Sequence, residues 1–200
     1  MIETIMYDPL DYKLSDFNSL DPGKGRILIS DPFLPDPYFK RSVVLLVDHS
    51  DQGSLGFILN KPLDITLSDT ELKIEGSQHK MHFGGPVQSS DLFYIHTKEN
   101  IPGSTSVSKN LYWGGNFSEV EGLLKDGLIT EHEIKFFVGY SGWEIDQLQK
   151  EIEEDSWLVS EIDISWIFKT DSVHLWKRIL EDMDDRISVL STFPEDPNMN

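Results

Sequence analysis

Residues 42–59 read SVVLLVDHSDQGSLGFIL, and this stretch decides what kind of fold the chain adopts. Two apolar runs, 42–47 and 54–59, flank a short segment of Ser, Asp, Gln and Gly that is typical of a turn. Uninterrupted apolar strands are expected where a sheet is covered on both faces. The stretch therefore predicts a buried β-hairpin.

Further strands are predicted on both sides of this hairpin. They share short apolar or aromatic runs bounded by turn-forming residues. They lie at 26–30, 80–83, 92–96, 110–113 and 134–138, with a weaker one at 162–168.

Three helices are predicted from their N-terminal capping residues. Asn116 stands three residues before Glu119 and opens an apolar face that ends at Gly127. Ser141 and Glu144 repeat this spacing ahead of a second helical pattern, and Asp171 precedes a third. Strands followed by interspersed helices predict one α+β domain, with a mixed, largely antiparallel sheet or partial barrel flanked by three to four helices.

The chain divides into three segments by composition. Residues 1–22 form an acidic N-terminal arm whose apolar residues, among them Tyr12, Leu14 and Phe17, are expected to dock on the body. Residues 23–191 form the domain. Residues 192–200 are short, polar and proline-containing, which predicts a disordered tail.

Composition excludes several classes of protein. The 200 residues include no cysteine, which rules out disulfides and thiolate chemistry. No apolar run is long enough to span a membrane and the N-terminus has no secretory pattern, so a cytoplasmic protein without membrane association is expected. The net charge is −18, of which −12 lies in the first 22 and last 51 residues. Without a cluster of Lys or Arg, direct nucleic-acid binding is not expected.

Three motifs combine glycine with aromatic residues: HFGGPV at 82–87, YWGGNF at 112–117 and GYSGW at 139–143. One interpretation is sharp turns, because glycine permits backbone conformations and close approaches that other residues do not. The other is an anion site formed by free N–H groups at the helix starts near Asn116 and Ser141. GYSGW also approaches the hydrolase pattern G-x-S-x-G, but Trp143 replaces its last glycine.

No complete catalytic or metal-binding set is present. His79 and His82 lie three residues apart, but Lys80 stands between them and a predicted strand begins nearby, so they are interpreted as a surface pair. No catalytic residue, metal site or cofactor is therefore predicted. Whether the protein is an enzyme at all stays open.

Several spaced motifs together resemble the AlgH/YqgE family of bacterial proteins. They are GRILISDPFLPDPYFKRSVVLLVDHSDQGSLGFILNKPL, HFGGPV, YWGGNF, GLLKDGLI and FFVGYSGWEIDQLQKEI, and the resemblance runs from about Gly23 to Leu180. It implies an α+β cytoplasmic protein with no secure activity or cofactor, and a role in regulating transcription of exopolysaccharide genes. The acidic arm and the Glu-Ile-Asp after Trp143 depart from the family pattern.

Two functional hypotheses follow. The first is a non-enzymatic regulatory or interaction protein that acts indirectly on transcription through a protein partner, with homo-oligomerisation left open. The second is a small-molecule or anion binding protein, or an enzyme, with a polar pocket around Arg41, His49 and Asn60. The candidate ligand-binding residues are Arg41, Ser42, His49, Asn60, Gly84, Gly85, Gly115, Asn116 and Ser141.

Overall fold

The computed structural model describes residues 12–70, 74 and 77–194. Its strands are β1 (Ile27–Ser30), β2 (Val43–Ser50), β3 (Gly53–Ile58), β4 (Pro62–Thr66), β5 (Lys80–Phe83), β6 (Val87–His96), β7 (Thr105–Ser108), β8 (Leu111–Trp113), β9 (Ile134–Trp143) and β10 (Trp157–Ser160). Its α-helices are α1 (Phe117–Lys125), α2 (Gln147–Glu153), α3 (Ile164–Lys169), α4 (Leu175–Glu181) and α5 (Asp185–Ser188). Four 3₁₀ turns join them: η1 (Leu14–Phe17), η2 (Leu67–Asp69), η3 (Ser172–His174) and η4 (Val189–Thr192).

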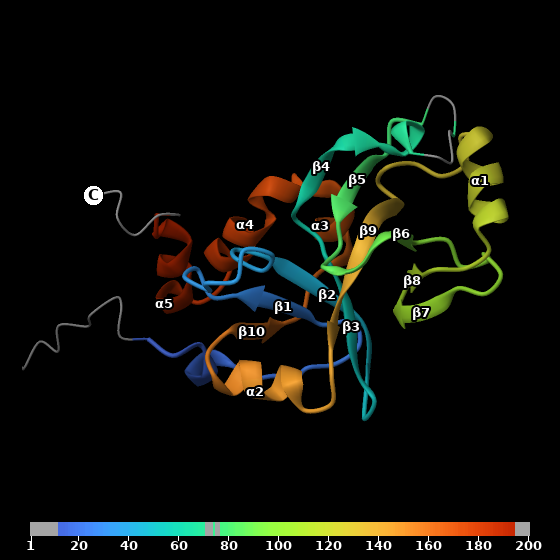
Figure 1. The fold of residues 1–200 in the computed structure, drawn as a ribbon. Helices are drawn as coiled ribbons and strands as arrows, with labels where there is room; N and C mark the ends of the chain where they lie inside the picture. The colour runs from blue at the N-terminus through green and yellow to red at the C-terminus, as the bar shows by residue number, and fades with distance from the viewer. Residues whose placement is uncertain (1–11, 71–73, 75–76, 195–200) are drawn as a thin grey trace, which may run out of the picture.

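The strands form one open sheet, in the order β10-β1-β2-β3-β9-β6-β8-β7, with β4 and β5 off this path. All pairings are antiparallel except that of β5 with β9. The predicted α+β class and the largely antiparallel sheet are confirmed, and the hairpin of 42–59 is β2–β3. Figure 1 shows α3, α4 and α5 on one side of the sheet and α2 on the other.

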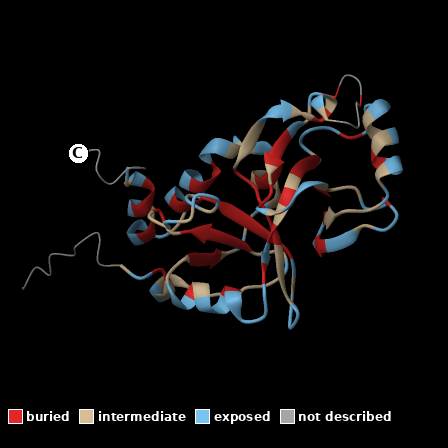
Figure 2. Cartoon of the chain, in the orientation of Figure 1, coloured by how far each residue is buried: buried red, intermediate tan, exposed pale blue. Residues whose placement is uncertain are grey.

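Strand alternation divides the buried residues between these two sides. Ile27, Ile29, Leu45 and Phe57 pack with α4, whereas the next residues along the same strands, among them Leu28, Val44, Leu46 and Ile58, pack with α2. Both faces of the central strands are therefore buried, as the uninterrupted apolar runs predict (Figure 2). A third cluster, which includes Phe136 and Val120, lies between the start of β9 and α1.

The N-terminal arm docks on the free edge of β10. Asn18 acts there as an added strand residue, because its side chain donates to the Trp157 carbonyl oxygen at 3.0 Å and accepts from the Val159 N–H at 2.7 Å. Leu14 is buried and the Tyr12 hydroxyl donates to Asp31. Docking of the arm is thus confirmed from Tyr12 onward, while residues 1–11 lie outside the described part.

Two predicted elements are wrong. Residues 162–168 do not form a strand, because the Asp163 side chain accepts from the Ser165 N–H and starts helix α3. Ser141 does not cap a helix. It lies inside β9, which continues to Trp143 because its last residues pair with β3, and α2 begins only after Asp146.

The other capping predictions hold. The Asn116 side chain accepts from the Ser118 N–H at the start of α1, and Asp171 accepts from the Val173 N–H at the start of η3. Strands β4, β7 and β10 are additional to those predicted. In the tail, the Phe193 ring stacks on Phe33 with centroids 5.3 Å apart, and residues 195–200 lie outside the described part.

Strand β9 is the element that joins the sheet. Along one edge it pairs with β6, and along the other it pairs first with β5 and then with β3. Where β5 ends, the backbone of Gly84 approaches β9 so closely that a Cβ there would lie 2.2 Å from the Gly139 carbonyl oxygen. The HFGGPV motif is therefore a close backbone crossing between strands.

Substitution of Gly84 by Ala is expected to reduce the free energy of unfolding by at least about 3 kcal/mol, since the added methyl meets backbone atoms that must shift. Gly122 in helix α1 offers a matched control, because a Cβ there meets nothing within 4 Å. Gly122→Ala is expected to stabilise the protein by about 0.5–1 kcal/mol through helix propensity. Urea unfolding of both variants tests the pair, and equal effects would contradict this account.

Candidate functional site

A cavity of about 410 Å³ lies where β5 and β9 meet the connection between α3 and α4. Its lining combines the residues before β5, the loop before β9 and the segment from Phe168 to Val173. Lys135 and His82 are the buried polar residues of its lining, and Ser172 lies beside them. This combination of a cavity with buried titratable side chains marks it as the candidate site.

Strand alternation places Lys135 in the cavity. Lys135 and Phe137 are two residues apart in β9 and so project to the same face of the sheet. Phe137 packs in the core with α4, and its ring lies 5.9 Å from the His82 ring. Lys135 occupies the next position on this face, under η3, and only 7% of its surface is exposed.

Three side chains form a continuous hydrogen-bonded chain. The Lys135 amine donates to Ser172 Oγ at 3.0 Å, and Ser172 Oγ lies 3.0 Å from His82 Nε2. Because a lysine ammonium only donates, Ser172 accepts from Lys135 and its own proton is directed to His82. The amine also lies 3.4 Å from the Leu59 carbonyl oxygen and 3.5 Å from His82 Nε2.

Burial controls the protonation of this chain. Loss of hydration lowers the pKa of Lys135 to about 8, and a coulombic contribution from Asp171 partly opposes the shift. Burial, together with the positive charge of Lys135, lowers the pKa of His82 to about 3. At neutral pH His82 is therefore neutral and Lys135 is largely protonated.

In the part of the chain that the structure describes, no carboxylate forms an ion pair with Lys135. Among the described residues, none of the ion pairs includes Lys135, whereas Lys98 and Lys125 each lie 2.7 Å from a glutamate. Asp171 is near enough to act on the Lys135 pKa, but its carboxylate pairs with His174 at 3.1 Å. Within the described residues, the hydrogen-bond partners of the amine are all neutral.

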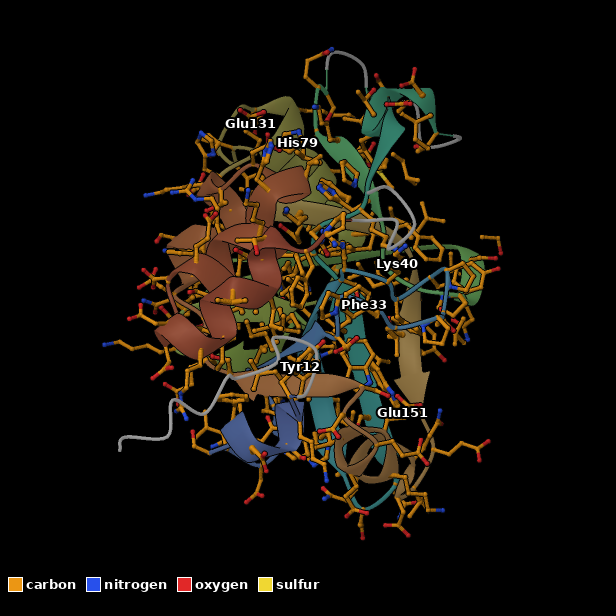
Figure 3. The ribbon with its side chains drawn as sticks, turned by 90° about the vertical axis from the view of Figure 1, so that its left-hand side faces the viewer. Tyr12, Phe33, Lys40, His79, Glu131 and Glu151 are labelled. Carbon is orange, nitrogen blue, oxygen red and sulfur yellow. The ribbon has the colours of Figure 1, made fainter. Side chains whose placement is uncertain are left out.

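The rim of the cavity carries further charged and imidazole groups. His79 and Glu131 lie next to each other there (Figure 3), and burial lowers the pKa of His79 while Glu131 acts to raise it. Lys80, Lys169 and His132 complete the rim. The lining holds three lysines and two carboxylates, so it is locally positive in a chain of net charge −18.

The predicted ligand-binding residues lie in separate places. Arg41, Ser42 and Asn60 are together at the start of β2. The Asn60 side chain joins two strands there, accepting from the Val43 N–H at 2.8 Å and donating to the Arg41 carbonyl oxygen at 2.9 Å. The Arg41 guanidinium donates to the carbonyl oxygens of Phe193 and Pro194 and stacks on Trp176. Ser42 is fully buried.

Two of the glycine motifs, HFGGPV and GYSGW, contact each other, whereas YWGGNF lines another cavity. Ser141 is fully buried and its hydroxyl donates to the Gly84 carbonyl oxygen at 3.0 Å, while Gly85 lies against the Tyr140 backbone. Gly115 lines a second, largely apolar cavity of about 740 Å³ that includes Trp113 and Phe117.

His49 is at the far end of the β2–β3 hairpin, where its Nδ1 lies 2.8 Å from Ser54 Oγ. Arg41, His49 and Asn60 therefore do not share one pocket, since most of β2 lies between Arg41 and His49.

The interpretation of His79 and His82 as a surface pair is wrong for His82, of which only 6% is exposed. The structure buries it because β5 pairs with both β4 and β9. Within the described residues, no group of three His, Asp, Glu or Cys side chains is placed to hold a metal ion.

Lys135 and Ser172 are the functional candidates absent from the sequence prediction. One signal for Lys135 is present, because it is the single charged residue within the apolar strand Ile134–Val138. Nothing comparable marks Ser172, which lies in a polar connection and is 37 residues from Lys135.

Known proteins with similar sequences cover almost the whole chain. A family model described as DUF179, AlgH-like, matches residues 27–188. The chain belongs to the AlgH-like family. A UPF0301 protein of Bacteroides thetaiotaomicron is 41% identical over 184 residues, which are 92% of this chain and 94% of that protein. A UPF0301 protein of Bacteroides fragilis is 40% identical with the same coverage.

Two solved structures share the fold of this AlgH-like protein. A crystal structure from Corynebacterium diphtheriae has a TM-score of 0.76 at 21% identity and covers 92% of this chain and 100% of that one. The solution structure of AlgH from Pseudomonas aeruginosa has a TM-score of 0.68 at 24% identity and covers 94% and 98%. No helix in the described part of the chain is long and apolar enough to cross a membrane.

The buried Lys135 predicts a pH-dependent stability. Its pKa is about 8 in the folded state against an ordinary value of 10.5, so between these values the unfolded chain binds more protons and folding stability rises with pH. Relative to Lys135→Met, the wild type should gain about 2 kcal/mol of unfolding free energy between about pH 7 and about pH 9.5. Urea unfolding of both proteins at the two pH values measures this difference. Lys125 lies in a surface ion pair, so the same comparison with Lys125→Met should show almost no change in unfolding free energy between the two pH values. A gain as large as that for Lys135 would contradict the assignment of the pH dependence to burial of Lys135.

Proposed function

We propose that this AlgH-like protein binds a small anionic molecule in the Lys135 cavity. The observation that carries the proposal is a buried ammonium group whose hydrogen-bond partners in the described structure are all neutral. Burying a cation costs several kcal/mol unless an anion compensates it. A ligand carboxylate or phosphate placed in the cavity would supply that compensation.

The size and charge of the cavity support the same class of ligand. A volume of about 410 Å³ lies within the range of ordinary small-molecule sites. Lys80 and Lys169 at the rim add positive charge, and Ser172 and His132 add hydrogen-bonding groups. A compact metabolite with one or two carboxylate or phosphate groups fits these features better than an apolar ligand does.

A thermal-shift and calorimetric screen of phosphate, malonate and other small dicarboxylates tests this function. At least one of these anions should raise the melting temperature, because a ligand that binds only the folded state stabilises it. Lys135→Met should weaken binding by about tenfold or more, the usual effect of losing a hydrogen bond from a charged donor. Affinity should also fall about tenfold between about pH 7 and about pH 9, as Lys135 loses its proton.

Lys125→Met is the matched control, since Lys125 lies on the exposed surface of α1 in an ion pair with Glu121. This variant should bind the anion as the wild type does. If no anion binds, or if both variants lose binding equally, the cavity is not an anion site.

A regulatory role in the bacterial cytoplasm, exerted through a protein partner, is a second proposal. The two Bacteroides relatives are bacterial proteins, and the cavity is connected to the C-terminal helices. Ser172 lies in η3, which leads directly into α4. In α4, the Trp176 ring stacks against the Arg41 guanidinium. Arg41 in turn donates hydrogen bonds to the carbonyl oxygens of Phe193 and Pro194. A ligand that contacts Ser172 would therefore change the packing of a surface segment.

Pull-down from a cell extract, with and without the anion found above, tests the regulatory role. We expect a protein partner whose recovery changes with the anion, and no mobility shift of DNA near physiological salt, because the net charge of −18 repels phosphates. Specific DNA binding at that salt, or repeated failure to recover a partner, would contradict the proposal.

A further inference from the structure

The Lys135 amine is held in a way that favours chemical reactivity. Its nearest partner is a hydroxyl, Ser172 Oγ at 3.0 Å, and its next is the Leu59 carbonyl oxygen at 3.4 Å. Among the described residues no carboxylate forms an ion pair with it, and it faces a cavity wide enough for a small molecule. Such an environment raises the proportion of neutral amine above that of an ordinary exposed lysine.

The neutral form matters because only an unprotonated amine has the lone pair that attacks carbon. With the pKa lowered to about 8 by burial, a substantial minority of Lys135 side chains are unprotonated just below pH 8. An ordinary lysine, with a pKa of about 10.4, is about 0.3% unprotonated at the same pH. Lys135 thus combines a partly unprotonated amine with an adjoining cavity, as lysines that form Schiff bases do.

We propose that Lys135 is a nucleophile that condenses with the carbonyl group of an anionic ligand, of the class of small 2-oxo acids, to form a Schiff base. The proposal rests on the anion site proposed above, since Lys80 and Lys169 at the rim would hold the ligand's carboxylate. The Lys135 nitrogen bonds to the carbonyl carbon, and the carbonyl oxygen leaves as water with the two amine protons. No oxidant or reductant is required.

Ser172 is placed to assist this condensation as a positioning and proton-relay residue. Its hydroxyl lies 3.0 Å from both the Lys135 amine and His82 Nε2. It is therefore within reach of the proton that moves from the amine to the departing oxygen. Attack on the carbonyl carbon by the Ser172 hydroxyl is less favourable. Its proton would have to pass to His82, which is a poor base because its pKa is about 3.

Reductive trapping tests the proposal. The full-length protein is incubated with pyruvate and sodium cyanoborohydride, and the modified lysines are located by mass spectrometry of peptides. Lys135 is expected to be modified at least about tenfold faster than Lys61 and Lys125, with a rate that rises with pH as the amine loses its proton. Lys61 controls for the effect of burial alone, because burial lowers its pKa as well. Its amine does not line the cavity and donates instead to the carbonyl oxygens of Pro37 and Tyr38.

Variants and alternative probes separate the possible outcomes. Lys135→Met should give no adduct at this peptide, and Ser172→Ala should slow trapping while retaining the site of modification. Comparison of lysines within the wild type does not depend on whether Lys135→Met folds. Even labelling of all lysines, or labelling of Ser172 by a fluorophosphonate probe without an adduct on Lys135, would overturn the assignment.

Two ligands distinguish failure of this inference from failure of the anion site. Malonate has carboxylates but no reactive carbonyl, and acetone has a carbonyl but no charge. Stabilisation by malonate without trapping of pyruvate would leave the anion site intact and reject the Schiff base. Trapping of acetone as fast as pyruvate would reject the anionic ligand class, and the expected result is rapid trapping of pyruvate only.

Discussion

The structure depends on the close approach of two backbones, where the end of β5 crosses β9. A Cβ on Gly84 would stand 2.2 Å from the Gly139 carbonyl oxygen, and one on Gly85 would stand 2.3 Å from the Tyr140 carbonyl. Only residues without side chains permit this contact. Because β5 leaves β9 at this point, the remainder of β9 is free to pair with β3, and one strand serves both parts of the sheet.

The candidate site follows from the same crossing. Parallel pairing of β5 with β9 sets His82 opposite Phe137, and Lys135 lies two residues earlier on the same face of β9. The connection from α3 to α4 then covers this face and brings in Ser172. The Lys135 ammonium is buried because it lies on the core-facing side of β9. The Ser172 hydroxyl and the Leu59 carbonyl oxygen accept its hydrogen bonds without neutralising its charge.

Local chemistry and long-range pairing differ in how far they can be read from the chain. Asn116 caps α1 as predicted, because a cap involves only the next few residues. Ser141 has the same spacing to a glutamate but lies in a strand, because pairing with Gly56, far away in the sequence, outweighs the local signal. The prediction for residues 162–168 failed in the opposite direction. Their aromatic and β-branched residues favour a strand, but Asp163 caps a helix there.

The sequence by itself determined the buried hairpin and the α+β class. Its spaced motifs indicated the AlgH-like family, and its composition showed acidic residues concentrated at the two ends. Only the tertiary structure decided the site. Lys135 meets Ser172, His82 and Leu59 across 37, 53 and 76 residues of chain, whereas Arg41, His49 and Asn60 do not converge. The reason is physical: periodicity tells which face of a strand a side chain takes, but not which distant segment covers that face.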